Sequence, residues 1–63
     1  MTYNEALQLV LDHDADAIDK ATHDFFGQTC GFDEQGRLYV EADQPVARER
    51  QIAFAEWARA NWN

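Results

Sequence analysis

The chain has 63 residues, a single cysteine, and twelve acidic against five basic residues, which gives a formal net charge of −7. A chain of this length forms one small domain whose core needs support from self-association or from a partner. The lone cysteine excludes an intrachain disulfide and a zinc site built from several cysteines. The excess of acids argues against direct binding to nucleic acid or to anionic membranes.

Charge is distributed unevenly along the sequence. Residues 1–36 hold eight acids and one base, whereas residues 37–63 hold four acids and four arginines, so the net charge belongs to the first part. Because 46% of the residues are hydrophobic and 13% are aromatic, we expect a folded chain. The first residues show neither a basic region nor a long apolar stretch, so we expect no signal peptide, no membrane span and a cytoplasmic protein.

The first part of the sequence predicts two helices. Thr2 and Glu5 have the spacing of a capping box, and apolar residues then recur at helical intervals. Asp14 would interrupt this apolar stripe, whereas aspartate is a favoured N-cap residue. We therefore predict helices at about Tyr3–Asp12 and Ala15–Phe26, with a single bent helix as the alternative.

A β-hairpin is predicted next. Gly27 is placed to end the second helix, and Asp33–Gly36 has the composition of a turn. The segment 37–42 alternates polar residues with apolar ones at the even-numbered positions, which predicts a half-buried strand. The preceding strand is expected at about Thr29–Phe32.

The last predicted helix runs from about Pro45 to Asn61. Asp43 or Gln44 is expected to cap it, with Pro45 in its first turn. Its predicted apolar stripe consists of Val46, Ala53, Phe54, Trp57 and Ala60, while Ile52 and Trp62, like Leu9 on the first helix, fall outside the apolar side. The expected fold is α+β: a mostly helical single domain over residues 1–63 with one β-hairpin, in the order α-α-β-β-α, or α-β-β-α if the first two helices are continuous.

Acidic residues form an ordered row on the predicted helices. Asp12 and Asp16 would stand ~6 Å apart along a helix axis, which is of the order of the phosphate spacing along a nucleic-acid strand. The alternative is a solvated face that serves solubility, and Lys20, four residues from both Asp16 and Asp24, favours it. The row consists of Glu5, Asp12, Asp16 and Asp19, with Asp24 on the same helix.

Signals for catalysis or metal binding are weak. His13 lies close to Asp14 and Asp16, and other ligand types gather loosely around His23, but no recognised metal motif is complete. Cys30 lacks the surroundings of a catalytic cysteine and is expected to be a small buried residue. We therefore expect no enzymatic activity, no catalytic residue, no metal and no cofactor.

These observations predict a small acidic protein–protein interaction module that binds a basic surface of a partner protein. In size, acidity and lack of catalytic residues the chain resembles, as a class, the small inhibitors encoded by phages and mobile elements, including DNA mimics and anti-CRISPR proteins. That resemblance implies inhibition of a nucleic-acid-binding partner. The alternative is a homodimeric adaptor or regulatory protein. The predicted contact residues are Glu5, Asp12, Asp16, Asp19 and Asp24, with Trp57 and Trp62 as a buried anchor or dimer interface.

Overall fold

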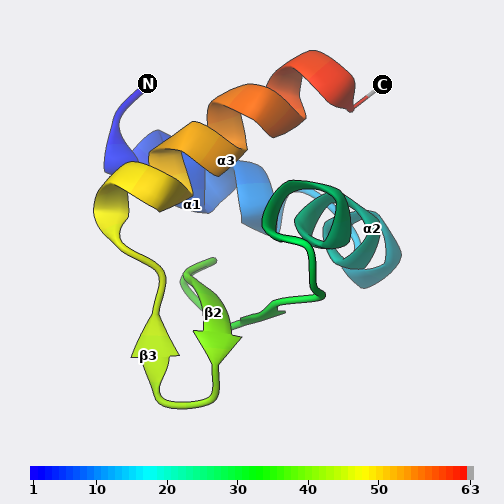
Figure 1. Ribbon diagram of the computed structural model, residues 1–63. Coiled ribbons are helices and arrows are strands. Elements are labelled where there is room, and N and C mark those ends of the chain that lie inside the picture. The colour runs from blue at the N-terminus through cyan, green and yellow to red at the C-terminus, as the bar shows by residue number, and fades with distance from the viewer. Residues whose placement is uncertain (63) are drawn as a thin grey trace.

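The computed structural model describes residues 1–62, which form three helices and one three-stranded antiparallel sheet. The helices lie together, with the sheet at one end of them (Figure 1). The elements are α1 (Tyr3–Leu11), α2 (Ala15–Phe26), β1 (Gly31–Phe32), β2 (Leu38–Glu41), β3 (Gln44–Pro45) and α3 (Arg48–Asn61). This order, α-α-β-β-β-α, confirms the predicted α+β class and adds a third strand to the predicted hairpin.

The first two helices are separate because each has its own side-chain cap. The Thr2 hydroxyl accepts the Glu5 N–H at 3.1 Å and the Glu5 carboxylate accepts the Thr2 N–H at 2.7 Å, which completes the capping box. The Asp14 carboxylate accepts the N–H of Ala17 at 2.8 Å and so begins α2. Gly27 ends α2 in the left-handed conformation, with φ 81°. The predicted break at Asp14 is confirmed, and the single bent helix is wrong.

The start of α3 differs from the prediction. Pro45 lies opposite Tyr39 in β3 instead of opening the helix, which begins at Arg48. The ladder continues past the proline, because the Val46 N–H donates to the Leu38 carbonyl at 2.8 Å. An edge strand tolerates proline because one of its sides makes no ladder hydrogen bonds. The residues around Pro45 are compatible both with an edge strand and with a first helical turn, so the sequence alone does not distinguish the two.

The predicted caps of α3 are also wrong, and its predicted apolar side is correct only in part, because Phe54 is buried and Val46 and Trp57 pack against the core. Asp43 lies in the turn before β3 and Gln44 lies within that strand, whereas the N-cap residue of α3 is Ala47, without a side-chain cap hydrogen bond. Ala53 and Ala60, predicted to be inside, are exposed. The buried residues of α3 recur every three or four positions and are Gln51, Phe54, Ala55 and Ala58. The sequence pattern pointed to some wrong residues of α3 because a polar residue, Gln51, lies on its buried side.

Leu38 is the only residue of β2 that the helices cover fully. Val40, predicted to point inward, is 37% exposed, and Ala42 is exposed as well. The far end of the sheet extends beyond the helices (Figure 1). The apolar residues that alternate with polar ones along β2 are therefore not buried there. The register is also irregular between Tyr39 and Glu41.

The core is centred on Phe54, which is fully buried. Its ring lies 5.6 Å from the ring centroids of Phe25 and Phe26, and 6.1 Å from that of Trp62. Trp62 and Leu9, predicted to point away from the apolar side, instead pack against this core. An aromatic cluster of this kind compensates for the small size of the domain.

The side chain of Gln51 connects α3 to the sheet. Its amide nitrogen donates to the Gly36 carbonyl at 3.0 Å, and its amide oxygen accepts the Leu38 N–H at 3.0 Å. Gln51 is fully buried, so these two bonds satisfy its own polar atoms as well as the backbone at the entry of β2.

Substitution of Gln51 tests this connection. Gln51→Met keeps the length of the side chain but leaves two buried backbone groups without their partner, so we expect the free energy of unfolding to fall by about 3 kcal/mol. The exposed Gln44→Met in β3 is the matched control, with an expected change within about 0.5 kcal/mol. Urea unfolding followed by circular dichroism measures both. Equal effects of the two variants would show that the buried amide is not a structural link.

Candidate interaction surfaces

The predicted acidic row is divided between two places in the structure. Glu5 lies on α1 and Asp12 caps its C-terminal end, and both border a shallow depression together with Arg59 of α3. Asp16, Asp19 and Asp24 lie on α2. The division follows from the separate caps of α1 and α2, because a continuous helix would be needed to keep the four residues of the predicted row, Glu5, Asp12, Asp16 and Asp19, in one line.

The two acids of α1 have local partners. The pKa of Glu5 is lowered, chiefly because its carboxylate accepts the Thr2 N–H in the capping box. Asp12 is the C-cap residue of α1 and accepts a hydrogen bond from the Gln8 amide at 2.8 Å. Both side chains are exposed, but the role that the structure shows for Glu5 is to cap the helix.

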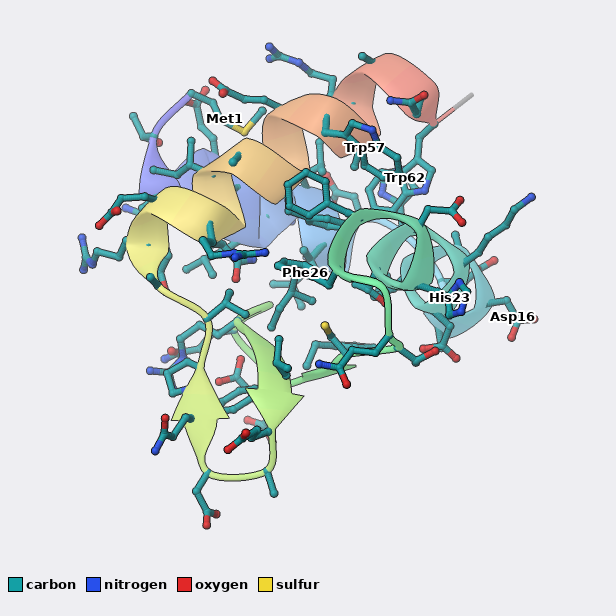
Figure 2. The ribbon with its side chains drawn as sticks, viewed as in Figure 1. Met1, Asp16, His23, Phe26, Trp57 and Trp62 are labelled. Atoms are coloured by element: carbon teal, nitrogen blue, oxygen red, sulfur yellow. The ribbon has the colours of Figure 1, made fainter. Side chains whose placement is uncertain are left out.

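The three aspartates of α2 form a rigid exposed surface, which we call the α2 acidic face (Asp16, Asp19 and Asp24). The opposite side of α2 is held in the core by Ile18 and Ala21, which are buried. Asp16 points away from α3, on the outer side of the molecule (Figure 2). All three aspartates are exposed, so their carboxylates are available to a partner.

No ion pair within residues 1–62 involves the α2 acidic face. The two that form there join the amino group of Met1 to Glu56 and the guanidinium of Arg37 to Asp33. The expected neutralisation of Asp16 and Asp24 by Lys20 is not seen as an ion pair in this described part of the chain. Lys20 lies between Asp16 and Asp24 on the same exposed side of α2, so this side keeps a net charge of −2 that faces the solvent or a partner.

Two arginines of α3 are directed at aromatic rings. The guanidinium of Arg48 lies 4.4 Å from the ring centroid of Tyr3, and that of Arg50 lies 5.1 Å from that of Phe26. These are cation–π contacts, in which the ring faces hold the positive charge. Positive charge is thus kept at the start of α3, and negative charge is exposed on α2.

The tryptophans predicted to anchor a partner already make contacts within the protein. Trp62 stacks on the His13 ring, with 3.6 Å between ring centroids and 24° between planes. Trp57 lies 5.4 Å from the ring of Phe25. Both are half-buried and pack against the hydrophobic core. Only their outer edges remain available for a partner.

The residues considered for metal binding or catalysis are used structurally or lie apart. His13 contacts the Leu9 carbonyl through Nδ1 at 2.8 Å, in addition to its stacking on Trp62. Cys30 is 1% exposed, which confirms it as a small buried residue, and burial raises the pKa of its thiol. Across residues 1–62, no three His, Cys, Asp or Glu side chains come together as a metal site. None of the helices in the same range is long and apolar enough to cross a membrane.

A groove that the sequence did not predict runs between α1, the β1–β2 turn and the start of α3. We call it the α1 groove; its volume is about 750 Å³. Leu7 and Leu11 line it from α1, Val46 from the segment before α3, and Arg37 and Arg48 from its two walls. Leu11 is 43% exposed. The sequence did contain one signal of this groove. The helix α1 has leucines on more than the one side that packs against the core.

Asp33 holds the wall of the α1 groove that contains Arg37. Its carboxylate accepts the N–H groups of Gln35 and Arg37 at 2.9 and 3.0 Å, the Arg37 Nε–H at 2.8 Å and the Tyr39 hydroxyl at 2.9 Å. Burial by itself raises the pKa of Asp33, but these hydrogen bonds outweigh it and lower the pKa to about 2.

Gly36 places this turn directly against α1. Its φ of 90° lies in the left-handed region, and a Cβ atom there would overlap the carbonyl oxygen of Leu7. Glycine is therefore needed at this position both for the conformation and for the close approach. Gly27 has a similar φ but open space around it, so only the conformation requires glycine there.

No protein-family model, no curated protein and no solved structure matches this chain. The function of the chain is therefore inferred from its own residues.

The low pKa of Asp33 makes a prediction about stability at acid pH. Because the ionised carboxylate is favoured in the folded state, it stabilises the protein fully above the unfolded pKa near 4, and this contribution is lost as the pH falls through about 2. Asp33→Asn should lower the free energy of unfolding at pH 7, and the difference from the wild type should shrink between about pH 4 and pH 2. Urea unfolding across this range measures it. Asp43→Asn, in the exposed β2–β3 turn, is the control, and a constant deficit of Asp33→Asn at every pH would contradict the prediction.

Proposed function

We propose that this protein is a non-enzymatic interaction module whose α2 acidic face binds a basic surface of a partner protein. The observation that carries the proposal is the set of three exposed aspartates on one rigid helix, without an ion pair among residues 1–62. Charges presented in this way attract a basic partner over a distance and orient it during encounter.

The geometry of α2 supports recognition of a broad basic surface. At a rise of 1.5 Å and a rotation of ~100° per residue, Asp16 and Asp24 are ~12 Å apart along the helix axis, and Asp19 is turned ~140° from Asp24, so the three carboxylates cover a broad side of α2. Because Ile18 and Ala21 anchor the other side of the helix, the carboxylates need little ordering when a partner binds. A partner surface that binds a nucleic-acid backbone carries the positive charges that such an acidic surface attracts.

Occupation of a nucleic-acid-binding surface would inhibit the partner by competition. This outcome agrees with the class resemblance to the small inhibitors of phages and mobile elements, such as DNA mimics and anti-CRISPR proteins. In this proposal the protein acts in the cytoplasm, contacts no nucleic acid itself and uses no cofactor. The exposed acids of α1, Glu5 and Asp12, would add to the attraction, and the outer edges of Trp57 and Trp62 would add apolar contact.

Neutralisation of the α2 acidic face tests the proposal. The variant Asp16→Asn/Asp19→Asn/Asp24→Asn and the wild type are immobilised and exposed to lysate of the source cells, and bound proteins are quantified by mass spectrometry. We expect a partner with a basic surface whose capture falls roughly tenfold or more with the variant, since interface charges steer binding, and which is also lost at high salt.

A charge-matched variant controls for net charge. Glu41→Gln/Asp43→Asn/Glu49→Gln removes three acids from β2, the next turn and α3, and should retain the partner. Circular dichroism checks that both variants fold. Equal retention of the basic partner by both variants would overturn the role of the α2 acidic face.

Self-association is a second candidate function, and a specific observation favours it. Phe32 and Val40 are 40% and 37% exposed and border one shallow depression of about 470 Å³. The strand β1, which contains Phe32, lies at an edge of the sheet. An edge strand beside exposed apolar side chains is a common route to pairing between two copies.

This second candidate predicts a dimer that depends on the sheet. Sedimentation equilibrium should give a mass approaching twice that of the monomer as the concentration rises, and Phe32→Ser with Val40→Thr should return it to the monomer. The control Ile52→Thr changes a half-buried aliphatic residue on α3. A monomer mass for the wild type at millimolar concentration would exclude self-association as the function.

A further inference from the structure

We infer that the α1 groove is a second docking site, which takes a short amphipathic helix with apolar and acidic side chains from a partner. The groove is lined by two of the five basic residues of the chain, Arg37 and Arg48, and by none of its twelve acids. Asp33 pairs with Arg37, whereas Arg48 has no ion pair within residues 1–62, so the groove keeps a local positive charge in a protein with a net charge of −7. An acidic segment therefore meets attraction at the groove and repulsion over much of the remaining surface.

The floor of the α1 groove is suited to apolar side chains. Leu7 and Val46 are half-buried, and Leu11 is the most exposed large apolar residue within residues 1–62. Leu7 and Leu11 are one helical turn apart and lie on the same side of α1. Their spacing matches that of the side chains on one face of an incoming helix.

Both arginines are held in place before a partner arrives. Arg48 lies over the Tyr3 ring, and the Nε of Arg37 is fixed by Asp33 at 2.8 Å. The side chain of Arg37 remains 40% exposed, so the other donors of its guanidinium can reach a carboxylate. Preorganised donors lower the entropic cost of binding.

The volume and rigidity of the α1 groove fit a short helical segment. About 750 Å³ is room for a few side chains, not for a whole domain. The close approach of Gly36 to the Leu7 carbonyl fixes the distance between α1 and the turn that forms the opposite wall. No residue that lines the groove belongs to α2, so this inference is independent of the proposed role of the α2 acidic face.

Titration with synthetic peptides tests the inference. The isotopically labelled protein is titrated with a peptide of about 14 residues that has leucines at i, i+3, i+4 and i+7, two glutamates beside that face, and alanine and glutamine elsewhere to favour a helix. We expect changes in the amide chemical shifts of Leu7, Leu11, Arg37 and Arg48. The same peptide with lysine in place of glutamate should bind at least roughly tenfold more weakly, since charge selects the occupant.

Variants of the protein assign the contacts. Leu11→Gln and Arg48→Gln should each weaken binding of the glutamate peptide roughly tenfold, as expected for central contacts of a small interface. Arg59→Gln removes an arginine outside the groove and should leave binding unchanged. The amide spectrum of each free variant shows whether it folds.

Three results would overturn the inference. They are equal binding of the lysine peptide, shift changes located away from the groove, and no shift change at millimolar peptide. Concentration-dependent shifts at Leu11 and Arg48 in the absence of peptide would assign the groove to a second copy of this chain instead.

Discussion

The buried amide of Gln51 is the interaction on which the arrangement of the domain depends. The strands have two, four and two residues, too few for a sheet that is stable by itself. Gln51 attaches the backbone at Gly36 and Leu38 to α3, and Gly36 in turn meets the backbone of α1. One side chain thereby fixes the sheet relative to two helices. The α1 groove exists because this attachment holds the turn beside α1.

The separation of charge follows from how each element meets the core. On α2, burial of Ile18 and Ala21 forces the aspartates outward, and the buried Thr22 hydroxyl bonds the Ile18 carbonyl at 2.8 Å. The arginines at the start of α3 are held over Tyr3 and Phe26, on other elements. Surfaces of opposite sign on one rigid domain favour binding to more than one kind of partner, because each surface selects by charge.

Features decided by a few neighbouring residues could be predicted from the sequence, and features decided by tertiary contacts could not. The caps at Thr2 and Asp14 depend on atoms within three residues, so the helix boundaries there are correct. Pro45 has the same local signal in a first helical turn as on an edge strand, and Gln51 looks like a surface residue until its partners are known. The α2 part of the acidic row was predictable from helical spacing, whereas the α1 groove depends on which elements flank α1.

A domain of this size is only marginally stable. Surface features that lower its stability or solubility therefore point to a function. Carboxylates that repel one another on α2 and an exposed Leu11 each work against a compact, soluble fold. Arg48 and Arg50 lie over aromatic rings, and neither forms an ion pair with the aspartates of α2 within residues 1–62. Local rules are typically broken where a protein acts on something else. The α2 acidic face and the α1 groove are the two surfaces that depart from these rules, and they are therefore the surfaces most suited to binding a partner.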